Sequence, residues 1–226
     1  MIPFRDNIPS RTFPFITVSL IIINSIVFLH ELTLGRQLNA FLFNYALIPA
    51  RLADSFGQMD VLGLLPLMTS MFLHAGWLHL IGNMWFLWIF GDNVEDYLGH
   101  FTYLLFYIFC GLAGNLSQVA LNWSSGIPCL GASGAIAGVL GAYLLLYPGA
   151  RVLTLIPLFI FWPIVEIPAF ILLGFWFVEQ FFYGVATSAA ASGGGIAWMV
   201  HVAGFISGMI LISLVKQSHR RHSMTW

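Results

Sequence analysis

The sequence predicts an all-α membrane protein that crosses the bilayer several times. Of its 226 residues, 59% are apolar and only 8% are charged, whereas roughly 25% are charged in a typical soluble domain. The mean hydropathy is +0.90. This balance excludes a soluble globular enzyme and a disordered chain, and a net charge of −1 leaves no basic surface for nucleic acid. We therefore expect a polytopic protein that contacts the lipid bilayer and binds no nucleic acid.

Six apolar runs define the membrane-spanning helices that we predict. They cover about residues 13–29, 77–90, 101–121, 130–147, 166–183 and 196–214. A helix needs about 20 residues to span a bilayer, so six helices use about half of such a chain. The second run ends in the polar stretch 91–96, and Pro148-Gly149 stops the fourth. Prolines interrupt residues 152–168, so we expect the fifth helix to begin near Glu166.

The segments between these helices are read as connections. Residues 33–65 are mixed in polarity and contain amphipathic pieces, which indicates a long loop lying partly in the membrane interface. Residues 184–195 contain four glycines and no charge, and they are a candidate mobile element beside the fifth helix. The whole chain is read as a single membrane domain with a core over residues 14–214 and a short basic cytoplasmic tail over residues 215–226.

The positive charges predict the orientation in the membrane. Six spans put both termini on one side, together with Arg5, Arg11, Arg151, Lys216, Arg220 and Arg221. The opposite side holds Arg36 and Arg51. Because cytoplasmic segments carry an excess of Lys and Arg, both termini are expected inside (N-in, C-in).

Polar side chains inside membrane spans are costly, so they indicate candidate sites. His79 and Asn83 are four residues apart and share one face of the second helix. Ser133 lies near the start of the fourth helix and His201 near the start of the sixth. These three helices all begin on the outer side, so a rise of ~1.5 Å per residue puts the four side chains within about 10 Å in depth.

Glycine spacing predicts that two of these helices touch. The fourth helix has a GxxxG motif beginning at Gly134, and the sixth has one beginning at Gly204. Such small-residue faces let membrane helices approach closely. His201 precedes Gly204 by three residues and shares its face, so Ser133 can face His201 if the helices pack there.

Each of these residues also has an ordinary structural explanation. A lone Ser in a membrane helix commonly donates to a backbone carbonyl, and a lone His or Asn can link two helices. Their combination at one depth favours acyl transfer, which needs a nucleophile, a base and donors for an oxyanion. A channel or small transporter is the rival class, but it needs a polar path across the whole bilayer.

Three motifs carry a family resemblance. Residues 74–83 read HAGWLHLIGN, residues 131–134 read GASG, and residues 201–208 read HVAGFISG. Their order and their patterns, HxxxxHxxxN, GxSG and HxxGxxxG, resemble the rhomboid family of intramembrane serine proteases in its simple bacterial form. The resemblance covers about residues 14–214 and implies a bundle of six transmembrane helices.

The resemblance implies roles for individual residues. Ser133 is the expected nucleophile and His201 its general base, in a dyad without an aspartate. The oxyanion hole is expected to consist of the Ser133 backbone N–H and the side chains of His79 and Asn83. Where some members place an aromatic ring against the catalytic imidazole, this chain has Ala137, so the imidazole must be oriented by something else.

Four further residues are expected to support this site. Gly131 is expected to line the substrate pocket, His74 and Gly204 to act structurally, and Glu95 to tie the bundle together at the inner end of the second helix. The resemblance implies no metal and no cofactor.

The implied reaction is hydrolysis of peptide bonds in or near the transmembrane segments of substrate membrane proteins. The alternative is a catalytically inactive rhomboid-like protein that binds such segments without cutting them. No Arg- and Ser-rich, transit-like leader precedes the first helix, so we expect a bacterial cytoplasmic (inner) membrane. The sequence leaves the oligomeric state open.

Overall fold

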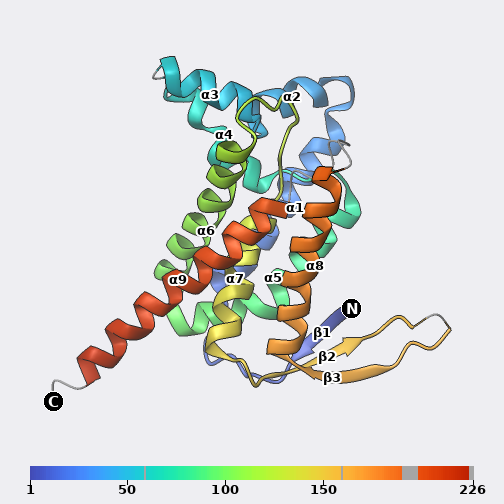
Figure 1. Cartoon of the computed structure of the whole chain (residues 1–226), viewed down its shortest axis with the longest axis vertical. Coiled ribbons are helices and arrows are strands. Elements are labelled where there is room, and N and C mark those ends of the chain that lie inside the picture. The colour runs from blue at the N-terminus through green and yellow to red at the C-terminus, as the bar shows by residue number, and fades with distance from the viewer. Residues whose placement is uncertain (59, 159, 190–197, 224–226) are drawn as a thin grey trace.

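The computed structural model describes residues 1–58, 60–158, 160–189 and 198–223, of which positions 56, 183–189 and 217–223 are described by their backbone only. The six predicted helices correspond to α1 (Phe15–Thr33), α5 (Trp77–Leu98), α6 (His100–Leu121), α7 (Ser133–Leu146), α8 (Ala169–Ala189) and α9 (Trp198–Ser223). They pack into a bundle in which α9 extends past the other helices at its C-terminal end (Figure 1). Part of the glycine-rich candidate segment, residues 190–195, lies outside the described residues.

Length and composition identify the helices able to cross a membrane. Within the described residues, α1, α6 and residues Trp198–Lys216 of α9 meet both conditions. A fourth candidate is the pair formed by Leu62–Phe72 and α5, which is bent by 79° at its break, and α7 and Ala169–Phe182 are shorter apolar helices. The chain is therefore a mainly helical polytopic membrane protein, which confirms the predicted fold class. The count of six spans and the N-in, C-in orientation stay predictions.

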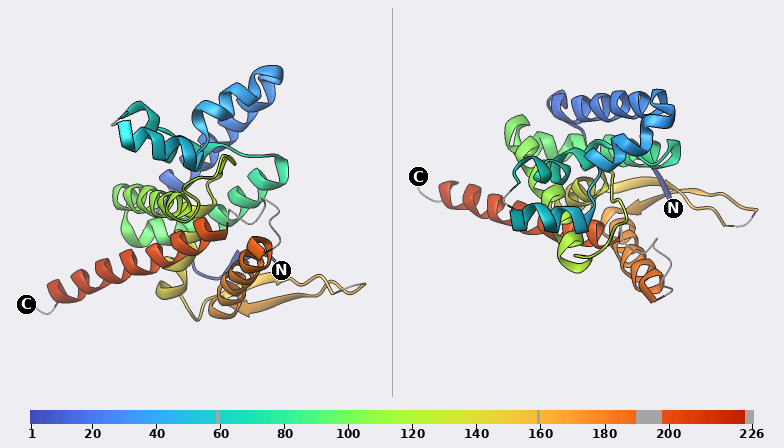
Figure 2. Two further views of the ribbon diagram at one scale, coloured as in Figure 1. Left: turned by 45° about the horizontal axis from the view of Figure 1, so that its top comes forward. Right: turned by 90° about the horizontal axis from the view of Figure 1, so that it is seen from above.

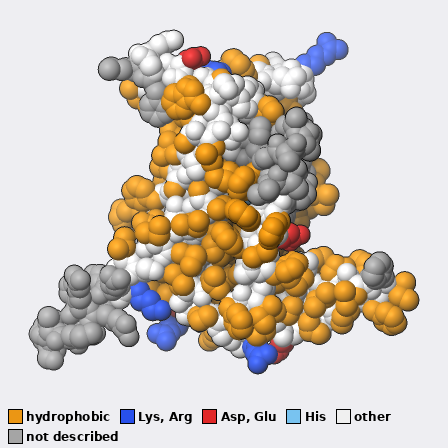
Figure 3. All heavy atoms as spheres, viewed as in Figure 1, with side chains coloured by type: hydrophobic (Ala, Val, Ile, Leu, Met, Phe, Trp, Pro, Cys, Tyr) orange, Lys and Arg blue, Asp and Glu red, His pale blue; other side chains and the backbone are white. Residues whose placement is uncertain are grey.

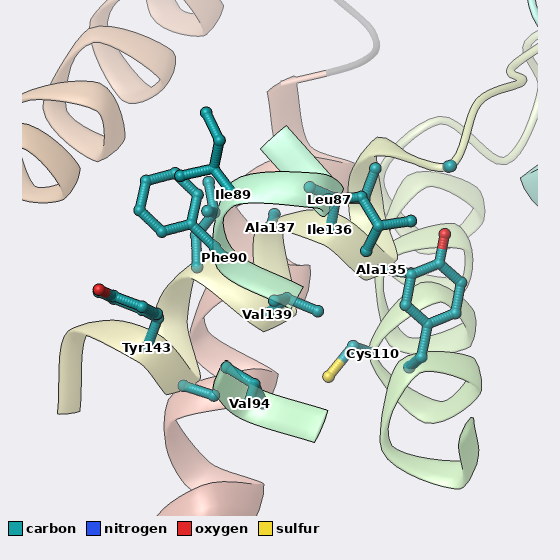
Figure 4. Close-up of a cluster of buried hydrophobic side chains, with 14 of the residues drawn as sticks. Leu87, Ile89, Phe90, Val94, Cys110, Ala135, Ile136, Ala137, Val139 and Tyr143 are labelled. Atoms are coloured by element: carbon teal, nitrogen blue, oxygen red, sulfur yellow. The ribbon is translucent and has the colours of Figure 1, made fainter. Parts of the chain in front are cut away.

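Helix α7 forms the centre of the bundle. Its residues 134–143 are all buried, and it packs against α5, α6 and α9. Figure 4 shows the cluster of apolar side chains around it, in which the rings of Phe90 on α5 and Tyr143 on α7 meet edge to face with centroids 4.9 Å apart. This core fixes the position of the first residue of α7, Ser133.

The contact between α7 and α9 is a direct approach of two backbones. A Cβ atom built on Gly204 would lie 2.0 Å from the carbonyl oxygen of Gly134, and one on Gly208 would lie 2.0 Å from that of Gly138. Atoms cannot come this close, so only glycine permits this packing. The two GxxxG motifs therefore meet, as their spacing predicts.

Helix α5 is longer than predicted, because the polar stretch 91–96 is helical as well. Its side chains bind the chain that precedes α1. Asp96 Oδ1 accepts hydrogen bonds from Thr12 N (3.0 Å) and Thr12 Oγ1 (2.7 Å), and Asn93 Nδ2 donates to Ile8 O (3.0 Å). The polar stretch ends the apolar run without ending the helix, so the predicted boundary at residue 90 was wrong.

Glu95, in the same stretch, ties α1 to α5. Its side chain is fully buried, and it accepts hydrogen bonds from the backbone N–H groups of Ile16 (2.9 Å) and Thr17 (2.8 Å). These donors lie in the first turn of α1, where no intrahelical acceptor is available. His100 Nδ1 lies 2.6 Å from Glu95 Oε1, the oxygen that also accepts from Ile16 N. The contacts agree with the bundle-tying role expected for Glu95.

A small antiparallel sheet lies beside the helices and was not predicted. It consists of β1 (Ile2–Asp6), β2 (Arg151–Leu155) and β3 (Ile164–Pro168), in that order. The β2–β3 hairpin projects away from the bundle (Figures 1 and 2). Glu166 lies in β3, paired with Leu153, so the fifth helix begins at Ala169 and not near Glu166.

The segment predicted as a long loop is largely helical. It contains η1 (Gly35–Gln37), α2 (Leu38–Tyr45), α3 (Pro49–Gln58) and η2 (Leu62–Leu64), and it is followed by α4 (Pro66–Thr69) and η3 (Ser70–Phe72). Helices α2 and α3 lie at the end of the bundle opposite the sheet (Figure 1). Two backbone hydrogen bonds between Leu47 and Cys129 (3.0 and 2.7 Å) join this layer to the chain that leads into α7.

Candidate active site

A cavity of about 230 Å³ lies between α5, α7, α8 and α9. Its polar lining comes from His79, Asn83, Ser133, Gln180 and His201. The other side chains around it are apolar or aromatic, including Phe86 and Trp176. Four of the five polar residues are those that the sequence groups at one depth, and the structure brings them to one cavity.

Ser133 and His201 are in direct contact. Ser133 Oγ lies 2.7 Å from His201 Nε2. Ser133 is the first residue of α7 and His201 lies in the first turn of α9, so the glycine contact between the two helices sets their separation. A hydroxyl bonded to an imidazole nitrogen at this distance is the arrangement of an activated serine nucleophile.

His79 lines the same cavity, with its ring beside Gly131. The backbone N–H of Ala75 donates to His79 Nδ1 (3.4 Å), so the ring proton is assigned to Nε2. A Cβ atom built on Gly131 would lie 2.8 Å from His79 Nε2 and 3.7 Å from Ser133 Oγ. His79 Nε2 and Ser133 Oγ therefore both lie close to Gly131, and both residues line the cavity.

Asn83 supplies a second donor one turn further along α5. Its side chain is 8% exposed, and among the described residues Asn83 Nδ2 has no hydrogen-bond partner. Leaving a buried amide donor unpaired costs about 1–3 kcal/mol. Asn83 and Ser133 both line the cavity.

Gly131 holds the turn that precedes Ser133. Its φ is +131°, a conformation that strains residues with a side chain, and its N–H donates to Ser70 O (2.9 Å). A Cβ atom here would collide with the His79 ring. Gly131 is buried behind His79 and is not among the residues that line the cavity, so it shapes the site from behind.

His74 and Gly204 also lie outside the cavity. His74 is 3% exposed, and its ring meets that of His79 at 5.2 Å between centroids and 66° between planes. Gly204 lies one turn after His201 and contacts α7. Both positions are those of supporting residues.

Gln180 and Trp176 are the site residues that the sequence analysis missed. Gln180 Oε1 lies 2.6 Å from His201 Nδ1, and the Trp176 ring lies 6.0 Å from the His201 ring between centroids. The signal was present, because Gln180 is a polar residue inside an apolar run and follows Trp176 by one helical turn. Within the described residues, no group of three or more His, Cys, Asp or Glu side chains could hold a metal ion.

The helical membrane fold and the interior serine–histidine pair define a class: a polytopic membrane protein with a hydrolase-like pair of side chains between its helices. Residues 62–218 match the family model described as "Rhomboid domain". This match covers more than half of the chain, and the chain belongs to the rhomboid family.

Several curated rhomboid proteins are similar to this chain. It is 29% identical over 157 residues to Rhomboid-like protein 11, chloroplastic, of Arabidopsis thaliana, covering 66% of this chain and 51% of that protein. It is 32% identical over 148 residues to Rhomboid protein 1, mitochondrial, of Saccharomyces cerevisiae (62% and 39%). It is 41% identical over 78 residues to Rhomboid protease GluP of Bacillus subtilis (34% and 15%). The matches therefore span about half or less of these relatives.

Proposed function

We propose that the chain is a serine endopeptidase that hydrolyses peptide bonds in or near the transmembrane segments of substrate membrane proteins. The observation that carries the proposal is the 2.7 Å contact between Ser133 Oγ and His201 Nε2, inside a cavity that also holds the unpaired donor Asn83 Nδ2. Nucleophile, base and oxyanion donors thus occur together.

In the proposed reaction, His201 Nε2 takes the proton of Ser133 Oγ as this oxygen attacks the scissile carbonyl carbon. The tetrahedral oxyanion accepts hydrogen bonds from the Ser133 N–H, His79 Nε2–H and Asn83 Nδ2–H. The Ser133 N–H suits this role, because donors in the first turn of a helix have no intrahelical acceptor. His201 then gives the proton to the leaving amine, and water activated by His201 hydrolyses the acyl-enzyme.

The surroundings of the site support a membrane protein as the substrate. The cavity lies between helices of a membrane bundle, and most of its lining is apolar. An apolar segment entering between the helices keeps its side chains out of water, while its scissile bond meets the polar residues. We keep the N-in, C-in orientation and a bacterial cytoplasmic membrane as part of the proposal, although two of the three relatives above carry chloroplast or mitochondrial names.

Cleavage of a single-span membrane protein in proteoliposomes tests the proposal. The wild type is expected to cut the substrate, and Ser133→Ala is expected to be inactive. Ser213→Ala is the matched control, because Ser213 lies far along α9 and its hydroxyl donates to Met209 O (2.7 Å); it should cut normally.

Absence of cleavage by the wild type is resolved with a fluorophosphonate probe. Labelling of the wild type but not of Ser133→Ala would show a competent nucleophile with a narrow substrate preference. Absence of labelling would contradict the proposal and favour the inactive, segment-binding alternative.

A further inference from the structure

The base in this site needs a defined proton arrangement. A neutral imidazole carries its proton on either Nδ1 or Nε2, and only the Nδ1–H form leaves the Nε2 lone pair free for a serine proton. Residue 137, one turn after Ser133, is a buried alanine and provides no ring that could hold the imidazole. The orientation of His201 must therefore come from another element.

The contacts of His201 show which element this is. Gln180 Oε1 lies 2.6 Å from His201 Nδ1, and Ser133 Oγ lies 2.7 Å from Nε2 on the opposite edge of the same ring. An amide oxygen only accepts hydrogen bonds, so this contact selects the Nδ1–H form. Trp176, one turn before Gln180 on α8, lies against the ring as well.

We propose that Gln180 is a positioning residue, which fixes the tautomer and orientation of His201 from α8. The inference rests on the proposed function, because it assigns Gln180 the place that an aspartate takes in a Ser-His-Asp triad. The neutral amide orients the ring and accepts the Nδ1–H bond of the imidazolium that forms. It adds no negative charge.

The charged and titratable groups near His201 make the role of Gln180 testable by pH. From α5 the ring faces His79, from α7 it faces Ser133, and from α8 it faces Gln180 and Trp176. Within the described residues, no carboxylate lines this cavity. A carboxylate placed at position 180 is therefore the first negative charge beside the ring.

The test compares Gln180→Leu and Gln180→Glu with the wild type in proteoliposomes. Leucine removes the acceptor, and we expect kcat to fall roughly 10- to 100-fold with little change in KM, a smaller effect than the ~10⁴-fold loss of a triad whose aspartate becomes asparagine. Glutamate keeps the acceptor and should restore most of kcat. It should also move the acidic limb of the pH profile of kcat/KM to higher pH, because a carboxylate favours the protonated ring.

The matched control is Glu179→Leu. Glu179 is the exposed neighbour of Gln180 on the same turn, so this variant has the same new side chain without the loss of the contact. Thermal unfolding of all variants identifies any that fail to fold. Equal kcat values for Gln180→Leu and Glu179→Leu, or an unchanged acidic limb in an active Gln180→Glu, would overturn the inference.

A ¹⁵N NMR measurement tests the role of Gln180 even if the chain does not cleave substrates. The histidine nitrogen shifts, with His201 assigned by its absence in His201→Ala, report the tautomer in an inactive protein as well. Nδ1–H in the wild type and a mixture of tautomers in Gln180→Leu support the positioning role. Identical tautomers in both proteins refute it, whether or not the chain cleaves substrates.

Discussion

At the residue scale, the contribution of Asn83 to stability does not explain its burial in the site. A donor such as Asn83 Nδ2, buried without a partner among the described residues, lowers the free energy of unfolding. In the same helical core, the buried Asn115 Nδ2 donates to Leu67 O (2.8 Å) and Ser70 Oγ (3.0 Å), whereas the buried side chain of Gln118 has, like Asn83 Nδ2, no partner among the described residues. Because Asn83 lines the cavity and Gln118 does not, we expect the Asn83 N–H₂ group to donate to an acceptor of a substrate.

Replacement of Asn83 by alanine measures its role. We expect kcat to fall by about 10²–10³, the usual effect of losing one oxyanion donor, and by less if His79 and the Ser133 N–H compensate. The free energy of unfolding should stay the same or rise, because an unpaired donor is removed. The measurement is turnover of a membrane substrate together with thermal unfolding.

Asn24→Ala is the control for this variant. Asn24 Nδ2 donates to Leu20 O (2.8 Å) within α1, away from the cavity, so its loss should affect stability and leave kcat unchanged. Normal turnover by Asn83→Ala would remove Asn83 from the oxyanion hole.

The sequence could predict the residues that meet in the site, but not all of their partners. His79, Asn83, Ser133 and His201 are recognisable because each is a polar residue near the start of a helix at one depth. Gln180 is recognisable as a polar residue in an apolar run, but its partner is not, because the contact with His201 spans 21 positions along the chain. The burial of Gly131 behind His79 likewise depends on packing and not on local pattern.

At the scale of elements, glycines decide how closely the helices of the site approach. Val200 on α9 packs against glycines of two neighbouring helices. A Cβ atom on Gly134 would lie 2.6 Å from Val200 Cγ1, and one on Gly114 would lie 2.9 Å from the same methyl group. The Val200 side chain thus fills the space that Gly134 on α7 and Gly114 on α6 leave open.

Gly208→Ala should separate α7 from α9. Its new Cβ would lie 2.0 Å from the backbone oxygen of Gly138, which cannot rotate away, so we expect a loss of about 1–3 kcal/mol from overpacking. Thermal unfolding in detergent micelles measures this loss. Gly174→Ala in α8 is the control. A Cβ atom at that position would meet no atom within 4 Å, apart from its own helix backbone and its chain neighbours. Equal stability of the two variants would contradict the close contact between α7 and α9.

Helix positions could be predicted from apolar runs, but helix ends and strands could not. The polar stretch 91–96 was read as the end of a helix, although its residues Asn93 and Asp96 bind the segment before α1. The sheet pairs β1 with β2 across about 150 positions, from Ile2 to Leu155. Such pairing leaves no periodic signal in a segment interrupted by prolines.

At the scale of the whole molecule, the chain presents apolar surface well beyond its helices. Hydrophobic side chains cover the middle of the bundle and continue onto the β2–β3 hairpin (Figure 3). At the tip of the hairpin, Ile160 is 86% exposed, Phe161 71% and Trp162 59%. The base of the same hairpin carries the charged residues Arg151 and Glu166.

The contrast between the apolar tip and the charged base predicts that the hairpin tip lies in the membrane interface, beside the bundle. Aromatic side chains favour that depth, and an open strand edge cannot enter the hydrocarbon core, where its backbone groups would lack partners. A fluorescent NBD label on Phe161→Cys in proteoliposomes should therefore emit at short wavelength. Lipids with a quencher near the headgroup should quench it more strongly than lipids with a quencher deep in the acyl chain.

The same label on Glu166→Cys, at the charged base of the hairpin, is the control. It should emit at the longer wavelength of a label exposed to water. The new cysteines can be labelled selectively near neutral pH, because Cys110 is fully buried and burial raises the pKa of the Cys129 thiol to about 11. If the label at position 161 has the same emission wavelength as the one at position 166 and neither quencher reduces its fluorescence, the hairpin tip is exposed to water. Its exposed aromatic tip would then have to be covered by another protein surface, because water alone does not favour three adjacent exposed apolar side chains.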